Sequence, residues 1–267
     1  MLKEYVVDAT KVPWKASETE GLTFQCQVLL SGDDGGPEAI RFRFDPTTAV
    51  YAHMHLTSQF QLLISGGMDM PRGQMNLRPV SIHYTDHNTP YGPFSCLPGH
   101  DMLVLHPKSG GLISMAHVNA RRKINLNARL LIAHLQDPNW CALPDLPGAR
   151  LQTLIPADVG PEALALQLPP GTALPTAPAE FGRYEVVIAG SARCGDETLG
   201  VAGFRYVHGD EAPAPMVAGP DGATIALLSF DADALEGGLT GEGIAVTAAQ
   251  AMARAISVSY THLTLPT

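Results

Sequence analysis

The sequence has few charged residues, few aromatic residues and no long hydrophobic run. Asp, Glu, Lys and Arg make up 16% of the 267 residues, and aromatic residues make up 6%. No segment approaches the ~20 consecutive apolar residues that a membrane-spanning helix needs. The polar N-terminus, MLKEYVVDATK, lacks the apolar core of a signal peptide. We therefore expect a cytoplasmic protein without a membrane partner.

An excess of positive charge is also lacking. The chain carries 17 Lys and Arg against 26 Asp and Glu, a formal net charge of -9. An acidic surface repels the phosphate backbone of nucleic acids and anionic lipid headgroups. We expect no nucleic-acid partner, and a small organic molecule remains as the expected ligand.

Motifs for several kinds of chemistry are missing. The four cysteines (Cys26, Cys96, Cys141 and Cys194) form no CxxC pair, so we expect free thiols in a reducing compartment. No GxSxG nucleophile motif occurs. The glycine-rich stretch Gly237–Gly243 lacks the strand-to-helix context of a phosphate loop, so we interpret it as a turn.

Short apolar runs separated by Gly and Pro are abundant, and they predict a β-rich protein. The sequence contains 26 Gly and 22 Pro, and several runs alternate with the period of two that is typical of half-buried strands. The first series of expected strands is Leu22–Leu30, Ala39–Phe44, Phe60–Ile64, Val80–Tyr84 and Met102–Leu105. The second series is Ala163–Leu168, Tyr184–Ala189, Gly203–Val207 and Thr224–Phe230.

The two series share their order of features. QFQLLISG ends at Gly66 in the first half, and RYEVVIAG ends at Gly190 in the second. This weak internal repeat of roughly 120 residues predicts a duplicated β domain. Its short strands favour a barrel or jelly roll, whose inward-facing side chains can form a ligand pocket.

The segment from His53 to Gly66 carries the strongest chemical signal. His53 and His55 are two residues apart, so on a strand both side chains point to one face. If that face lines a barrel, the two imidazoles converge on one point, as metal binding requires. Gln59 follows at a spacing that could present its side-chain oxygen to the same point.

This segment resembles the first motif of the cupin superfamily, HxH followed by Glu and Gly, with Gln59 in the place of Glu. The second cupin motif aligns with Asp86–Tyr91 (DHNTPY), where Tyr91 takes the place of the usual third histidine. The resemblance implies an all-β fold of two tandem cupin barrels (double-stranded β-helices, or jelly rolls) with few short helices. It also implies a divalent metal (Zn, Fe, Mn, Ni or Cu) held by His53, His55, Gln59 and Tyr91.

The departures from the cupin pattern weaken this ligand set. Gln is a neutral and weaker ligand than carboxylate, and Tyr must lose a proton of ordinary pKa about 10 to bind a metal strongly. Tyr91 is therefore also a candidate catalytic acid or base. His83 and His87, close to Tyr91 in sequence, are candidates for substrate binding or for the missing third ligand. We expect His100 and His106 at the surface near a turn.

The second half loses the motif altogether. Aligning Gly190 with Gly66 places Ala177 and Ala179 at the two histidine positions and Arg183 at the Gln59 position. We therefore expect a metal-free second barrel that covers the first, forms a homodimer or buries an edge strand. We expect Arg183 in a salt bridge or at the surface, with an anionic ligand as the alternative.

These features divide the chain into four parts. We expect the first barrel at 1–115, a connector packed on the barrels at 116–155 and the degenerate second barrel at 156–256. The last residues, VSYTHLTLPT, resemble the translation of a sequencing adapter, so we interpret 257–267 as an artefact.

Three functions are compatible with this organisation. The first is a metal-dependent enzyme of dioxygenase or isomerase type. The second is a non-catalytic protein that binds or senses a small molecule, and the third is a scaffold with a relic site. Metal content separates the first from the others, because fold alone does not decide the reaction.

Overall fold

The computed structural model describes residues 3–19, 22–33, 35–46, 48–71, 75–116 and 124–237. Strands dominate this part of the chain, and its helices are single 3-10 turns: η1 (Ala9–Lys11), η4 (Asp137–Asn139) and η5 (Asp233–Leu235). The predicted all-β fold class is confirmed. Within the same ranges, no helix is long and apolar enough to cross a membrane.

The first barrel consists of a large antiparallel sheet and a two-stranded sheet. The large sheet has the order β12-β9-β7-β10-β4-β3-β2, with β5 and β8 attached to β10 and β7. Its strands are β2 (Lys15–Thr19), β3 (Leu22–Ser31), β4 (Glu38–Phe44), β5 (Ala49–Val50), β7 (Gln59–Asp69), β8 (Asn76–Leu77), β9 (Ser81–Thr85), β10 (Phe94–His106) and β12 (Leu130–His134). The small sheet pairs β6 (His53–His55) with β11 (Leu112–Ser114).

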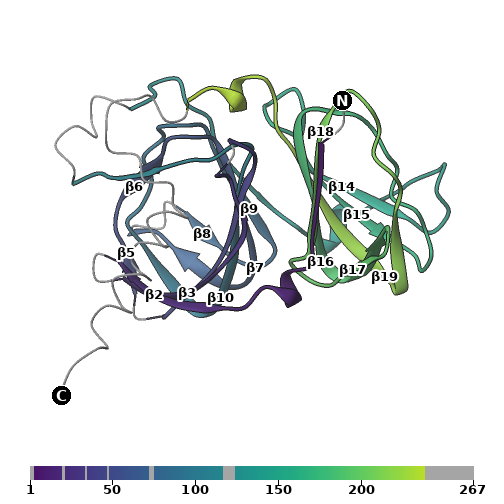
Figure 1. Cartoon of the computed structure of the whole chain (residues 1–267), viewed down its shortest axis with the longest axis horizontal. Helices are drawn as coiled ribbons and strands as arrows, with labels where there is room; N and C mark the ends of the chain where they lie inside the picture. Colours follow the sequence, from purple (N-terminus) through teal and green to yellow (C-terminus); the bar gives the residue numbers. More distant parts are fainter. Residues whose placement is uncertain are drawn as a thin grey trace, which may run out of the picture.

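The second barrel is built on one sheet of the order β1-β18-β16-β19-β15-β14-β13, with β17 paired to β16. Its strands are β1 (Lys3–Val7), β13 (Cys141–Ala142), β14 (Arg150–Ile155), β15 (Ala163–Leu168), β16 (Ala179–Cys194), β17 (Glu197–Leu199), β18 (Phe204–Gly209) and β19 (Met216–Ser229). Figure 1 shows the two barrels side by side. Each main sheet has the same sequence of long strands, as duplication predicts.

The strand registers confirm the internal repeat residue by residue. Gln61 lies opposite His83 in the first barrel, and Glu185 lies opposite Arg205 in the second. The two aligned glycines, which lie inside β7 and β16 rather than at their ends, also agree, with φ values of +72° for Gly66 and +71° for Gly190. A Cβ at either glycine would lie within 2.3 Å of backbone atoms of a neighbouring segment. Only glycine fits this turn, because it lacks a Cβ and tolerates positive φ.

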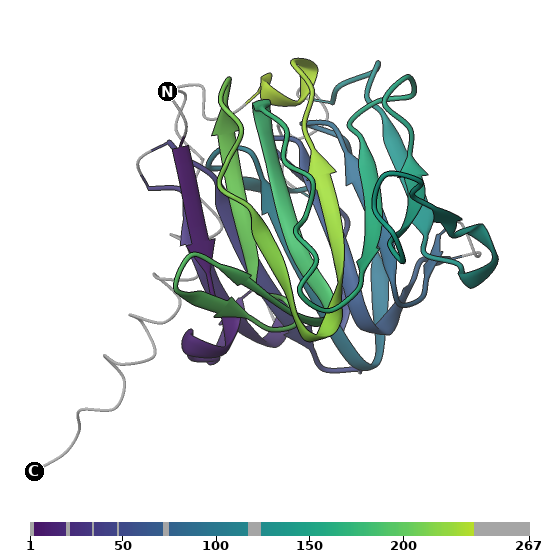
Figure 2. The ribbon, with the colours of Figure 1, turned by 90° about the vertical axis from the view of Figure 1, so that its right-hand side faces the viewer.

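The structure differs from the expected division of the chain because the barrels exchange edge strands. β1 lies in the second sheet, where all five of its residues pair with β18. β12, from the expected connector, pairs with β9 of the first sheet. Figure 2 shows β1, in purple, at the edge of the second sheet. Each exchanged strand covers an edge that would otherwise expose unpaired backbone groups.

The rest of the connector is also part of the barrels. β13 and β14 extend the second sheet, so the described part of 116–155 contributes strands to both sheets. Residues 117–123 and the proposed artefact at 257–267 lie outside the described residues. The four cysteines are free, as expected, with Cys26, Cys96 and Cys194 buried and Cys141 exposed.

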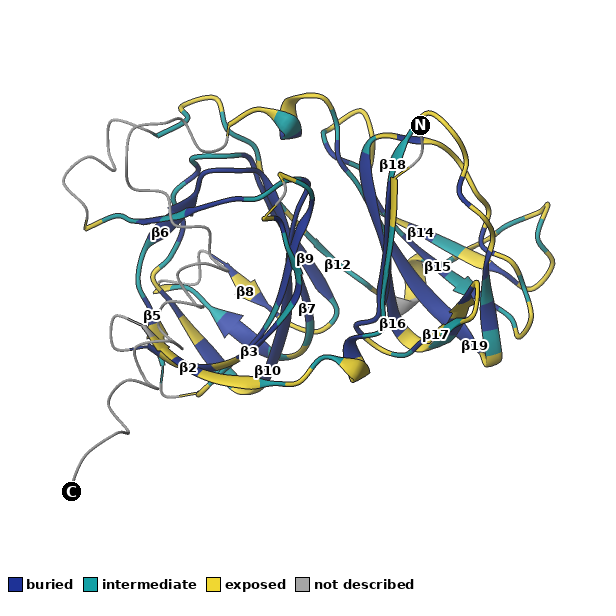
Figure 3. Cartoon of the chain, viewed as in Figure 1, coloured by how far each residue is buried: buried dark blue, intermediate teal, exposed yellow. Residues whose placement is uncertain are grey.

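The main hydrophobic core lies between the two sheets, which pack face to face (Figure 3). Alternation along β7 turns Phe60 and Leu62 towards this interface, where Phe60 packs on Phe230 with ring centroids 5.1 Å apart. The Tyr184 hydroxyl donates across the interface to the carbonyl of His106 at 2.9 Å. The opposite face of β7, with Gln59 and Gln61, therefore points into the first barrel.

Candidate functional site

The HxH segment forms the short strand β6, whose two histidines face the barrel interior. His53 pairs with Ser114 and His55 pairs with Leu112 across the small sheet. Met54, between them, turns the other way into a separate apolar cluster. His53 also forms a backbone bridge with Tyr91, so the two predicted motifs lie side by side.

A cavity opens beside these side chains. Its polar end is formed by His53, His55, Gln61, Tyr91 and His106, and the cavity volume is about 90 Å³. The other lining residues are Tyr51 and ten apolar side chains: Leu22, Phe24, Ile40, Phe42, Phe44, Val50, Phe94, Met102, Val104 and Leu112. Apolar walls with a few polar groups at one end are typical of sites for small organic ligands.

Tyr91 is the centre of the polar end. Its hydroxyl lies 2.8 Å from His53 Nε2, 3.1 Å from Gln59 Nε2 and 2.7 Å from Gln61 Nε2. The two amide nitrogens can only donate, so they occupy both lone pairs of the hydroxyl oxygen. Its proton is then available to His53 alone. The Tyr91 hydroxyl therefore has a full set of hydrogen-bond partners.

Backbone contacts orient this network. His53 Nδ1 lies 2.8 Å from the carbonyl oxygen of Tyr51, which can only accept a hydrogen bond. His53 Nδ1 thus carries the proton, and Nε2 presents the lone pair that accepts from Tyr91. On the other side, His83 Nδ1 lies 2.6 Å from Gln61 Oε1. The hydrogen bonds run in one direction, from His83 through Gln61 and Tyr91 to His53.

His106 corrects one expectation from the sequence. It was expected at the surface, but it is fully buried and its ring lies beside His55, with centroids 5.1 Å apart. Its Nδ1 lies 3.1 Å from the carbonyl of Ser58 and 3.0 Å from the Thr57 hydroxyl. Its Nε2 lies 3.9 Å from a carboxylate oxygen of Glu38, beyond hydrogen-bond distance.

His100 corrects the same expectation, because it is buried on β10 rather than exposed. Its ring packs edge-on against Phe44, with centroids 5.5 Å apart. Neither of its ring nitrogens meets a hydrogen-bond partner within the described residues. It does not line the cavity.

Burial keeps the histidines of the site neutral. Desolvation lowers the pKa of His53 and of His106 to about 4 and that of His83 to about 3. It lowers the pKa of His55 well below its ordinary value, assisted by the neighbouring histidines. Burial also raises the pKa of Tyr91 well above its ordinary value of 10, although the amides of Gln59 and Gln61 oppose this shift. At neutral pH the site carries neutral imidazoles and an intact phenol.

The turn that carries Tyr91 is held from both barrels. Burial opposes ionisation of Asp86, but hydrogen bonds from Arg129 and Tyr84 outweigh it and lower the pKa of the carboxyl. Arg129 also forms an ion pair with Asp231, which follows β19 of the second barrel. His87 lies in this turn, where its backbone N–H donates to Ser58 Oγ at 3.1 Å. Its ring does not line the cavity.

The predicted metal-ligand set does not fit a metal ion in this arrangement. The His53 lone pair and the Tyr91 proton are used by one another, and Gln59 turns its amide nitrogen, not its oxygen, towards Tyr91. Across the described ranges, no three His, Cys, Asp or Glu residues are grouped so that they could hold a metal.

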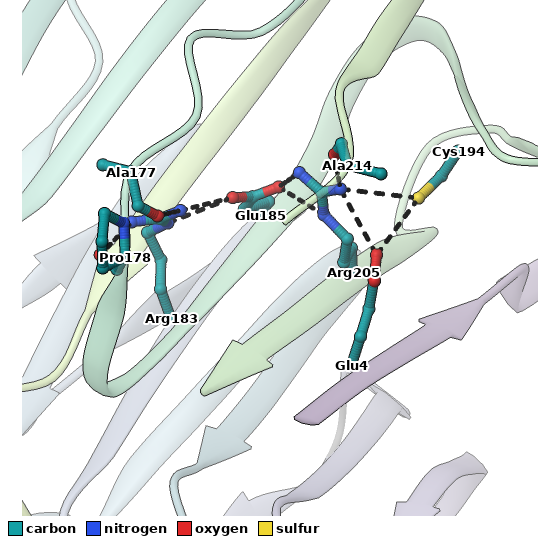
Figure 4. A network of polar contacts seen from close by, with 8 residues as sticks. All are labelled: Glu4, Ala177, Pro178, Arg183, Glu185, Cys194, Arg205 and Ala214. Carbon is teal, nitrogen blue, oxygen red and sulfur yellow. Dashed lines mark hydrogen bonds and ion pairs between the residues drawn. The ribbon is translucent and has the colours of Figure 1, made fainter. Parts of the chain in front are cut away.

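Glu185 and two arginines fill the equivalent place in the second barrel (Figure 4). By register, Glu185 and Arg205 take the positions of Gln61 and His83. Arg205 Nε donates to Glu185 at 2.8 Å, and both side chains are fully buried. Arg183 Nη2 donates to Glu185 at 2.8 Å and to the carbonyl of Ala177 at 2.9 Å.

This network bears on the predicted role of Arg183 and on the interior of the second barrel. Arg183 is salt-bridged, as expected, and the ion pair occupies the interior where a ligand would otherwise bind. Glu4 of the exchanged strand β1 also contacts Arg205 at 3.3 Å, so the strand exchange supplies a charge to the network. Apolar side chains such as Val187, Leu199 and Ile225 fill the rest of this interior.

Gln61 and His106 are the site residues that the sequence did not indicate. A signal for Gln61 existed, since it lies two residues after Gln59 and shares its face of the strand. No local signal identified His106, because its place beside His55 depends on how β10 crosses the barrel.

Comparison with known proteins identifies the fold. No family model and no curated protein matches the sequence. A protein of Nostoc punctiforme assigned provisionally as a dioxygenase has a TM-score of 0.64 at 14% identity, over 91% of this chain and 87% of its own. The chain has the bicupin fold. The chain also resembles the 11S allergen of Cocos nucifera, with a TM-score of 0.57 at 9% identity over 86% of this chain and 89% of that one.

The vicilin of hazelnut, Corylus avellana, has a TM-score of 0.52 at 12% identity, over 85% of this chain and 86% of its own. At these identities the likeness is one of fold. The bicupin neighbours therefore leave the chemistry of the first barrel to its own residues.

Proposed function

We propose that the first barrel binds a small, largely apolar organic molecule without a metal ion. The cavity supplies apolar walls and one polar end, and the second barrel closes the other face of the first sheet. This is the binding or sensing function among the three that the sequence allows.

The Tyr91 hydroxyl is the observation that carries this proposal. In the predicted metal site it would be a ligand, but here it donates to His53 and accepts from Gln59 and Gln61. A metal ion would have to break a buried network of hydrogen bonds, and each buried polar group left without a partner costs about 1–3 kcal/mol. The Tyr91 hydroxyl already has its full set of partners, which favours a preformed binding site.

The second candidate is a metal-dependent enzyme of dioxygenase or isomerase type. It is favoured by the convergence of His53, His55 and Tyr91 at one end of a cavity, with ring centroids 4.5 to 6.2 Å apart. The Nostoc punctiforme neighbour, assigned provisionally as a dioxygenase, points the same way. In this case Zn, Fe, Mn, Ni or Cu would polarise an oxygen of the substrate.

Metal content decides between the two candidates. Protein purified without chelators is analysed for metals, before and after titration with Zn²⁺, Fe²⁺, Mn²⁺, Ni²⁺ and Cu²⁺. We expect well below one metal per chain, and the same value for His53→Ala/His55→Ala. One equivalent that this variant loses, but that His134→Ala/His208→Ala keeps, would overturn the proposal.

Ligand binding is tested by thermal shift with a library of small organic molecules. We expect some to stabilise the protein, and we expect the shift to disappear in Val104→Trp, which fills the cavity. Val159→Trp, at a half-exposed position, is the matched control that should retain the shift. Homodimerisation and a cytoplasmic location stay predictions from the sequence.

A further inference from the structure

The walls of the cavity are flat and aromatic on one side. Phe24 of β3 and Phe42 and Phe44 of β4 form a cluster in which Phe42 and Phe44 stack, with centroids 5.6 Å apart and planes 16° apart. Tyr91 and Phe94 form a second stacked pair, with planes 12° apart. Planar walls of this kind favour a ligand that is itself a flat ring.

Charged side chains do not line the cavity. Its sixteen lining residues, all within the described ranges, include no Asp, Glu, Lys or Arg. A charged ligand would lose its hydration without gaining a counter-charge, which costs far more than burial of a neutral group. The lining thus favours a neutral ligand over a carboxylate, a phosphate or an ammonium.

His106 presents a lone pair at the polar end of the cavity. His106 Nδ1 faces the Ser58 carbonyl, which can only accept, so Nε2 of this ring carries a lone pair. His55 Nδ1 lies beside it, and neither nitrogen has a hydrogen-bond partner within the described part of the chain. Both rings line the cavity. Buried acceptors without a donor favour a ligand that donates a hydrogen bond.

We infer that the first-barrel cavity selects neutral flat-ring molecules that carry a hydroxyl, the chemical class of phenols and naphthols. The ring stacks between the aromatic walls, and the hydroxyl donates to the ring nitrogens of His106 or His55. This inference rests on the proposed binding function and specifies its ligand.

Three matched probes test the class by isothermal titration at pH 7.5: 2-naphthol, its methyl ether and 2-naphthoate. They share a ring system but differ in the group that meets the polar end, namely a neutral donor, a neutral acceptor and an anion. We expect 2-naphthol to bind about tenfold more tightly than the methyl ether, the difference that one good hydrogen bond supplies. We expect 2-naphthoate to bind more weakly still.

Variants show which residues cause the preference for naphthol over its ether. His106→Leu and, independently, His55→Ala should reduce the preference for naphthol over its ether, whereas His208→Ala in the second barrel should retain it. Because the preference is also measured on the unaltered protein, a variant that fails to fold leaves the test intact.

The outcomes separate this inference from the proposed function. Equal binding of naphthol and its ether, or tightest binding of naphthoate, overturns the ligand class while cavity binding stands. Failure of all three probes while the library still yields ligands that Val104→Trp loses also overturns the class alone. Failure of both the probes and the library overturns the proposed function as well.

Discussion

The Tyr91 hydroxyl shows how a single substitution in a motif changes what a site can do. A histidine at this position would offer a lone pair to a metal. Tyr91 instead offers a proton to His53 and two lone pairs to the amides of Gln59 and Gln61. With tyrosine rather than histidine at this position, the hydroxyl is fully bonded to its neighbours and offers no free lone pair to a metal.

Tyr91→Phe tests that network. The variant leaves His53 Nε2 and the amides of Gln59 and Gln61 without their shared partner, so we expect a loss of ~2–3 kcal/mol in the free energy of unfolding. Chemical denaturation measures it. Tyr5→Phe is the matched control, because no hydrogen bond of the Tyr5 hydroxyl occurs within the described residues. Equal stability of Tyr91→Phe and the control would argue against the network.

Substitution of Arg205 is the corresponding test in the second barrel. Replacing one member of a buried ion pair leaves an uncompensated charge, so Arg205→Leu should cost about 3–5 kcal/mol in the free energy of unfolding. Removal of both charges in Glu185→Leu/Arg205→Leu should recover part of this loss. The double-mutant cycle measures the coupling. Additive losses in the cycle would show that the two side chains act independently.

At the scale of elements, the exchange of β1 and β12 links the two barrels. Each strand precedes one barrel in the chain but completes the sheet of the other. The reason is physical, since an uncovered edge of β9 or β18 would expose unpaired backbone groups. The exchange also delivers Glu4 to Arg205.

Deletion of residues 1–8 tests this arrangement, because it removes β1. We expect the backbone amides of β18 to exchange with solvent faster and the melting temperature to fall, since β18 becomes an edge strand. Hydrogen exchange followed by mass spectrometry locates the effect. Amides of β10, in the middle of the first sheet, should keep their protection, and unchanged exchange in β18 would contradict the role of β1.

At the scale of the whole molecule, buried neutral histidines make stability depend on pH. His53 and His106 have a pKa of about 4 in the folded protein, against an ordinary value of 6.5. Between these values the unfolded chain binds more protons than the folded protein. The stabilisation that these histidines contribute should therefore be complete above pH 6.5. As the pH drops towards 4, the free energy of unfolding should fall by about 1.4 kcal/mol per pH unit for each such histidine.

Denaturation at half-unit steps from pH 7.5 to 4.5 measures this slope. His100→Leu provides an internal calibration, because the pKa of His100 is also about 4 and the residue lies outside the cavity. In this variant the free energy of unfolding should depend less steeply on pH, by the contribution of one histidine. A stability that is flat between pH 6.5 and 4.5 would contradict buried neutral histidines.

The sequence by itself determined the β class, the duplication and the shared face of His53 and His55, because these follow from local periodicity and spacing. It also located Gln59 and Tyr91 in the motifs. The tertiary structure alone decided that Tyr91 is at the centre of the network, that Gln61 joins it, that His106 packs beside His55, and that Arg205 fills the second barrel. It likewise decided the strand exchange. These depend on strand register and on sheet packing between residues far apart in the chain, where a shift of one residue would turn every side chain to the opposite face.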